Sequence, residues 1–409
     1  MGPPQLPRCH DLTLPVAGSS TIRQLLSLAL LQARSTLSGL SSPEPTDPRA
    51  ALRRLLPTLD PGFLLSALRR PSRLTLARCL ATSPLEPQRS SWGRSLAASL
   101  CLDAAEVGLL PGPLEFAFEG ELLSERSGWV LRLPQGTHLL LASGQIELRT
   151  HQGASSSTLP ASPEQIEEAL QNAGVPAQRA HFPLWDNTVL LLHDTNPLAE
   201  IEAHPAKSGN RVDLGGHSPE QWRDALQGAF QVIQQYLPEI AHEMDLLLGH
   251  IGPVGYFDQA HLSASYLEAT GVVYLSLHPH RMTLVEALVH EFQHNKLNLF
   301  LGLDPALENA DWPLYASPVR PDPRPLRGVL LAVHAFQPIV KLYERLCGEP
   351  TARESEQGWR RQRLGEVARL CREGCDVLLP HGKPTVAGRP LLEEIRELDE
   401  RFKMLLGAG

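Results

Sequence analysis

A short strand followed closely by a long helix constrains the fold of this 409-residue chain more than any other feature. Gly271–Leu277 has the β-branched and aromatic residues expected of a buried strand. Thr283-Leu-Val-Glu286 has the spacing of a capping box, which predicts a helix that begins at about Thr283. Gly302 then predicts a left-handed helix end, and Pro305 prevents the helix from continuing.

The predicted helix carries His290, Glu291 and His294 in an HExxH pattern. Residues four apart project from one face of a helix, about one turn apart, so the two imidazoles can hold one ion. Glu291 is rotated by about 100° and still reaches the hydration shell of that ion. The alternative is an accidental match, or two histidines that are merely buried. We predict a mononuclear metal site with His290 and His294 as ligands.

A third protein ligand is expected, because two histidines hold an ion weakly. Metzincins would have glycine at 297 and histidine at 300, where this chain has Leu297 and Phe300, so that class is excluded. We predict His334 as the third ligand, since it is a lone imidazole on an apolar helix that Pro338 should bend. The alternatives are a core histidine bonded to a carbonyl group, or a carboxylate ligand from Glu308, Asp311 or Glu344.

Composition narrows the class of protein. Apolar residues make up 42% and charged residues 20%, which is ordinary for a soluble globular chain with room for two or three domains. The formal net charge of -8 argues against a nucleic-acid partner. No apolar run is long enough to span a membrane, and no signal peptide is evident. The six scattered cysteines indicate reduced thiols and a cytoplasmic location.

The hydrophobic pattern predicts an α+β fold that is predominantly helical, with a helical metal-binding core and a small antiparallel sheet in an accessory region. We divide the chain into a helical N-terminal region at 1–110, a small β region and linker at 111–160, and a catalytic α+β domain at 161–409. Individual helices are predicted at 19–40, 163–173, 219–237, 283–300, 326–346, 352–378 and 391–406. A strand is predicted at 185–193 and a loop at 151–160.

The stretch from about Thr283 to Leu346 resembles the HEXXH-motif peptide-modification proteins found with ribosomally made natural-product precursors. The resemblance is carried by the motif itself, by Asp322-Pro-Arg-Pro-Leu-Arg-Gly328, and by the following helix with His334. It covers roughly the last third of the chain and hardly touches the residues before Pro163.

This resemblance implies an iron(II)- and 2-oxoglutarate-dependent oxygenase that hydroxylates a side-chain β-carbon of a precursor peptide. It also implies that His290, His294 and His334 bind the iron and leave positions open for 2-oxoglutarate and dioxygen. Arginine suits the distal carboxylate of 2-oxoglutarate, and Arg324 and Arg327 are the predicted partners. The alternative for these arginines is a solvated loop tied by Asp322.

Two other functions fit the same residues. In a zinc peptidase, Glu291 would be the general base and zinc would lower the pKa of the attacking water to about 7. In an oxygenase, Glu291 would only orient a ligand or a water molecule. A third possibility is a non-catalytic peptide-binding protein that uses the residues before 110 or the strands at 114–149.

Overall fold

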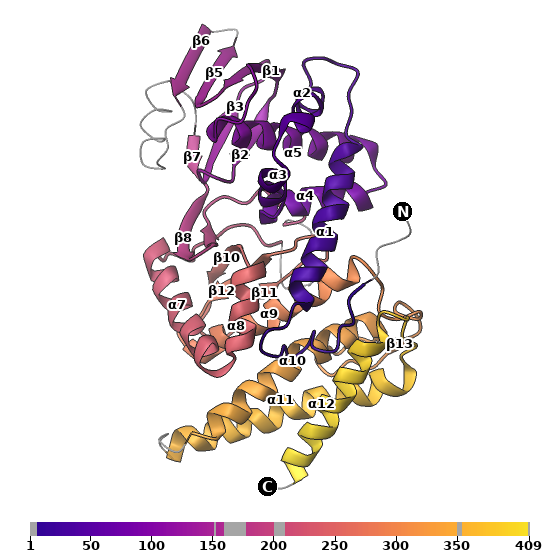
Figure 1. The fold of residues 1–409 in the computed structure, drawn as a ribbon. Helices are drawn as coiled ribbons and strands as arrows, with labels where there is room; N and C mark the ends of the chain where they lie inside the picture. The colour runs from indigo at the N-terminus through magenta and orange to yellow at the C-terminus, as the bar shows by residue number, and fades with distance from the viewer. Residues whose placement is uncertain (1–5, 151–152, 159–176, 200–208, 350–353, 408–409) are drawn as a thin grey trace. The chain divides into compact units, whose positions relative to one another are not determined.

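The computed structural model describes residues 6–150, 153–158, 177–199, 209–349 and 354–407 (Figure 1). The chain mixes helices with several small sheets and forms two compact units. The first unit contains Met1–Ala29, Leu184–Thr188 and Asp213–Gly409, and the second contains Leu30–Pro183 and Val189–Val212. Residues 6–29 therefore belong to the same unit as the HExxH motif.

The first unit contains a mixed sheet. Strand β12 (Val272–Leu277) is parallel to β10 (His250–Tyr256) on one side and antiparallel to β11 (Ser263–Ala264) on the other. Every residue of β12 is buried, which confirms the predicted buried strand. Two further strands, β8 (His181–Trp185) and β9 (Thr188–Leu191), form a hairpin whose tip lies in this unit.

That hairpin corrects the single strand predicted at 185–193. The chain reverses at Asp186 and Asn187. Asp186 has a φ of 32°, a conformation that aspartate and asparagine tolerate better than most residues. The turn therefore divides the apolar segment at 185–193, which had predicted one continuous strand, between two strands.

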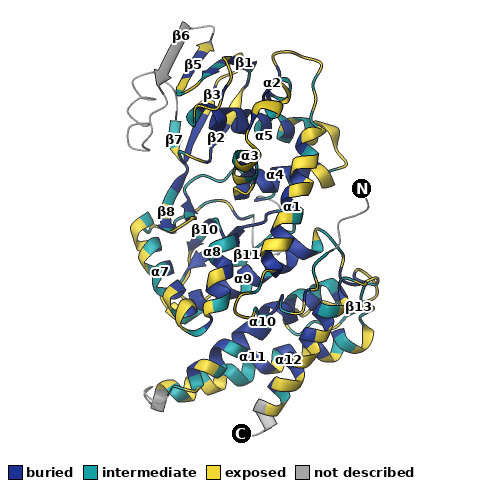
Figure 2. Ribbon diagram, viewed as in Figure 1, coloured by how far each residue is buried: buried dark blue, intermediate teal, exposed yellow. Residues whose placement is uncertain are grey.

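Six helices complete the described part of the first unit, and five of them agree with predicted helices. Their bounds are α7 (Pro219–Tyr236), α8 (Pro238–Leu247), α9 (Arg281–Leu301), α10 (Leu326–Cys347), α11 (Glu354–His381) and α12 (Arg389–Gly407). Helix α8 was not predicted. Helix α9 packs on β12, α7 and α10, and most of it is buried (Figure 2).

Two predicted boundary features of α9 are wrong. The helix begins at Arg281 with His280 as its N-cap, and no side chain caps it, so there is no capping box at Thr283. Glu286 instead accepts hydrogen bonds from Tyr343 and Arg363, because these tertiary partners replace the helix's own first turn. Gly302 has a φ of -71° and is right-handed.

Buried polar side chains of α9 hold it to its neighbours. Asn295 accepts a hydrogen bond from the Gly271 amide at 2.6 Å and donates to the Val272 carbonyl at 2.7 Å, which fixes the start of β12. Lys296 forms a fully buried ion pair with Glu243 of α8 at 2.5 Å. Satisfied polar groups in a core specify one arrangement of the elements that they join.

Helix α10 runs through Pro338 without interruption. Proline has no amide proton, so the His334 carbonyl lacks its usual partner within the helix. Gln293 of α9 supplies a substitute and donates from Nε2 to this carbonyl at 3.4 Å. The proline thus makes a carbonyl of α10 available to the motif helix.

A non-helical N-terminal segment, Leu12–Leu14, is bound in the core of the first unit. Leu12 and Thr13 are fully buried, and the Thr13 carbonyl accepts a hydrogen bond from Gln293 at 2.7 Å. Glu394 of α12 accepts the Thr13 amide at 3.0 Å and the Leu14 amide at 2.8 Å. These bonds link residues about 280 and 380 positions apart in the sequence.

The second unit has helices beside two antiparallel sheets. Its helices are α2 (Pro48–Leu55), α3 (Pro61–Leu68), α4 (Pro71–Thr82) and α5 (Glu86–Glu106), after α1 (Thr21–Ser38), which is shared with the first unit. The sheets have the orders β1-β4-β5-β6 and β2-β3-β7. The strands are β1 (Leu114–Ala117), β2 (Gly120–Ser124), β3 (Trp129–Leu133), β4 (His138–Ala142), β5 (Gln145–Thr150), β6 (Gly153–Thr158) and β7 (Ala177–Arg179).

The strands predicted at 114–149 are confirmed, but they belong to two sheets and not to one. The loop predicted at 151–160 is wrong for β6, which pairs along its whole length with β5. A serine-rich composition had suggested a turn, and strand pairing overrides that local preference. The helix predicted at 163–173 lies outside the described residues.

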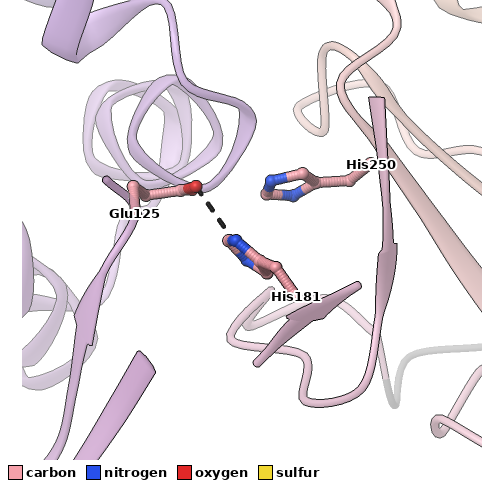
Figure 3. A group of neighbouring side chains, drawn as sticks. All are labelled: Glu125, His181 and His250. Atoms are coloured by element: carbon pink, nitrogen blue, oxygen red, sulfur yellow. Dashed lines mark ion pairs between the residues drawn. The ribbon is translucent and has the colours of Figure 1, made fainter. Parts of the chain in front are cut away.

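Charged groups buried in the second unit are paired, as the cost of burying charge requires. Arg73 and Asp103 form an ion pair at 2.5 Å. Glu125 and His181 lie 4.0 Å apart, and Figure 3 shows the carboxylate directed toward the imidazole. The six cysteines form no disulfide bond in the part of the chain that the structure describes. None of the helices in the described ranges is long and apolar enough to cross a membrane.

Glu394 should make the stability of the fold depend on pH. Burial raises the pKa of Glu394 to about 8, against the opposing effect of the Leu14 and Thr13 amides. A carboxyl group with a raised pKa in the folded chain stabilises the fold fully below its unfolded pKa, and this contribution is lost as pH rises toward the folded pKa. The free energy of unfolding should therefore fall by on the order of a few kcal/mol between about pH 4.5 and about pH 8.

Urea unfolding of the wild type and of Glu394→Gln across this pH range measures the effect. The neutral amide should flatten the profile, because it removes the titrating group and keeps an oxygen for the backbone amides. Glu397→Gln, at an exposed position of α12, should leave the wild-type profile unchanged. Identical profiles for Glu394→Gln and the wild type would contradict the assignment.

Candidate metal centre

The structure brings His290, Glu291 and His294 together on α9. One ligand atom from each residue lies within 4.8 Å of those from the other two. The imidazole centroids are 4.4 Å apart, and the ring planes meet at 79°. This spacing is compact enough for all three side chains to contact one ion.

Neighbouring elements fix the directions of these side chains. Phe336 of α10 packs edge-on against His290, with ring centroids 4.9 Å apart. Ser265, directly after β11, donates a hydrogen bond to Glu291 Oε2 at 2.6 Å. The strand, the motif helix and the following helix therefore all contribute to one site.

The surroundings keep the carboxylate ionised. Burial by itself would raise the pKa of Glu291, but the imidazoles of His294 and His290 lower it. Hydrogen bonds from Ser263 and Ser265 act in the same direction, and the pKa of Glu291 lies below its ordinary value. An ionised carboxylate can accept a proton or bind a cation.

The two histidines are suited to binding a metal. Burial, assisted by the neighbouring His294, lowers the pKa of His290 to about 4, and burial also lowers the pKa of His294. Neutral imidazole is the form that binds metal ions. The Nδ1 atom of His294 is buried and has no hydrogen-bond partner among the residues that the structure describes. Such an orphaned atom is costly, and a metal ion would satisfy it. The residues therefore fit a bound ion.

His334 does not join the group formed by His290, Glu291 and His294. It is fully buried, and its Nε2 lies 3.2 Å from the Leu12 carbonyl. A bond from Nε2–H to that carbonyl leaves a lone pair on Nδ1, which has no partner within the described ranges. Histidine ligands are often oriented in this way, and so are histidines in a packed core. His334 as a ligand stays a prediction.

The predicted arginines are tied by carboxylates. Arg324 forms an ion pair with Asp322, and Arg327 forms one with Asp311, each at 2.9 Å. Both side chains are 38% exposed, and neither lines the cavity beside His290. The Arg324–Asp322 pair matches the alternative of a solvated loop tied by Asp322, whereas Arg327 lies in the first turn of α10 and pairs with Asp311.

A cavity of about 460 Å³ opens beside His290. Its walls come from α9, α10, α11 and the segment around β11. The lining residues are His261, Ser263, His280, Met282, Thr283, Glu286, Ala287, His290, Phe336, Ile339, Trp359, Arg363 and Glu366. Its volume lies in the range of sites that bind small ligands or side chains.

Sequence reasoning missed Ser265, Glu286 and Arg363 as residues of this site. Glu286 had a usable signal, because it lies four residues before His290 and so shares its helix face. Ser265 and Arg363 had none, since they reach the site from other elements.

No family model matches this chain, and no curated protein is detectably similar to it in sequence. The candidate site therefore depends on its own geometry.

Ser265→Ala should weaken metal binding about tenfold, because groups that orient residues at a metal typically affect affinity by about 10–100-fold. Competition with a chromogenic chelator measures the affinity for zinc(II) and iron(II). Ser27→Ala, at an exposed position of α1, is the matched control. Wild-type affinity in a folded Ser265→Ala chain would show that Ser265 does not position Glu291 for the metal.

Proposed function

We propose that this chain is a mononuclear metal enzyme that acts on a peptide. His290 and His294 would bind the ion, with the Glu291 carboxylate at the same centre. One observation carries the proposal: two imidazoles and a carboxylate converge within 4.8 Å beside a cavity of about 460 Å³. A buried site with open space on one side can hold an ion and admit a substrate.

Within this class, we propose an iron(II)- and 2-oxoglutarate-dependent oxygenase that hydroxylates a side-chain β-carbon of a ribosomally made precursor peptide. The resemblance of the last third of the chain supports it, and so does the donor set. Two histidines and one carboxylate with open positions are typical of non-haem iron(II) oxygenases. Iron with 2-oxoglutarate would supply the oxidising power for attack on an unactivated carbon.

The protein's own residues would position and shield the reacting groups. Phe336 packs against the His290 ring, and the apolar side chains of Met282 and Ile339 line the cavity, where they would limit the access of water. Arg324 and Arg327 keep their proposed role at the 2-oxoglutarate carboxylate only if they exchange Asp322 and Asp311 for the cosubstrate.

Zinc peptidase is the second candidate, and the position of Glu291 favours it. Its carboxylate is ionised, held by Ser265 and close to both imidazoles. That arrangement suits a general base that takes a proton from an attacking water molecule. Zinc in such a site polarises the scissile carbonyl group.

His290→Ala and His294→Ala should each abolish stoichiometric metal binding and reduce turnover to background. Each variant removes one of two imidazole ligands from a single centre. Metal analysis after reconstitution with iron(II) or zinc(II), followed by the activity assay, measures both effects. His138→Ala, a half-exposed histidine of the second unit, should retain the metal. Full metal content in either motif variant would overturn the proposed centre.

Glu291→Gln separates the two reactions. In a peptidase the variant should keep its zinc and lose at least about 100-fold in peptide cleavage, since general-base catalysis contributes roughly 10²–10⁴-fold. In an oxygenase that uses Glu291 as a ligand, the variant should lose iron. The wild type would then consume 2-oxoglutarate and add one oxygen atom to the peptide. Mass spectrometry of the peptide distinguishes hydroxylation from cleavage.

A further inference from the structure

The cavity beside His290 has apolar walls and a charged end. Ala287, Phe336, Ile339 and Trp359 contribute apolar surface from three helices. Trp359 is partly exposed, and its ring lies 5.8 Å from that of Tyr343. Such walls suit a long hydrocarbon chain or an aromatic ring.

Glu286, Arg363 and Glu366 form the charged end. Arg363 donates to Glu286 from Nε at 3.0 Å and from Nη2 at 2.6 Å, and to Glu366 from Nη1 at 2.9 Å. Tyr343 also donates to Glu286 at 2.6 Å. Each nitrogen of the guanidinium is therefore already bonded to a carboxylate.

The charges at this end do not balance. Two carboxylates face one guanidinium, which leaves a formal charge of -1 among the charged lining residues. Glu366 is 42% exposed, and its hydrogen bonds from Arg363 and Gln362 leave lone pairs that can accept further bonds. Arg363 already gives three of its five N–H donors to these carboxylates, so the excess negative charge at this end favours a cation.

We propose that this cavity binds a basic side chain, lysine or arginine, of the substrate peptide and thereby sets sequence specificity. The hydrocarbon stem of that side chain packs between Phe336 and Trp359, and its charged head contacts Glu366. Trp359 also offers a ring face to the cation. This inference depends on the proposed peptide substrate.

The cavity places the basic side chain close to the proposed metal ligands on α9. Glu286 lies one helical turn before His290, so the charged end is about 6 Å along the axis of α9 from the first metal ligand. A lysine or arginine side chain spans such a distance. The basic residue is therefore the reacting residue of the peptide or its immediate neighbour.

Calorimetric titration tests the preference with three acetylated, amidated hexapeptides that differ only in one central residue: lysine, norleucine or glutamate. The full chain is loaded with zinc(II), and no 2-oxoglutarate is present, so binding is read without turnover. The lysine peptide should bind at least about tenfold more tightly than the norleucine peptide, and the glutamate peptide most weakly. This advantage should shrink at high salt, because Glu366 is partly exposed.

Glu366→Gln should remove most of the lysine advantage and leave norleucine binding unchanged. Glu373→Gln is the matched control, since Glu373 also pairs with an arginine of α11 but does not line the cavity. Glu366→Lys should reverse the preference toward the glutamate peptide. Equal binding of lysine and norleucine peptides, no binding at millimolar concentration, or an unaffected Glu366→Gln variant would overturn the inference.

Metal analysis of the reconstituted chain, set beside the same titration with metal-free chain, separates this inference from the proposed function. A lysine preference in a chain that takes up no metal would support the specificity site and reject the metal enzyme. Metal-dependent turnover with no preference for lysine would support the metal enzyme and reject the specificity site.

Discussion

The buried polar side chains of α9 are the constraint on which the rest of the first unit depends. Gln293 bonds the Thr13 and His334 carbonyls, Asn295 bonds the backbone where β12 begins, and Lys296 pairs with Glu243. A buried polar group without its partner costs about 1–3 kcal/mol, so each contact disfavours any shifted position of the helix. Helix α9 is therefore fixed to an N-terminal segment, a strand and two helices at once.

This fixed helix explains how the site is organised. His290, Glu291 and His294 share α9, so their relative positions follow from the helix itself, while Ser265 and Phe336 reach them from elements that α9 holds in place. The same helix carries Glu286, at the charged end of the cavity, one turn before His290. The proposed metal ligands and Glu286 thus lie on successive turns of one helix.

Several expectations failed where a distant partner displaced a local one. Glu286 has the spacing of a capping box, yet Tyr343 and Arg363 take its carboxylate. Pro338 leaves the His334 carbonyl without its helical partner, as expected, yet Gln293 from another helix bonds that carbonyl. Strand β6 formed from a serine-rich segment, because pairing with β5 satisfies its backbone. In each case the deciding partner lies on another element.

The sequence by itself determined the buried strand β12, the helices after it and the pair His290 and His294. These features follow from hydrophobic periodicity and from the fixed spacing of residues within one helix. Only the tertiary structure decided that Ser265 holds the Glu291 carboxylate, and that Arg363 rather than Arg324 or Arg327 lines the cavity. Those outcomes depend on contacts between residues far apart in the chain, which no local pattern encodes.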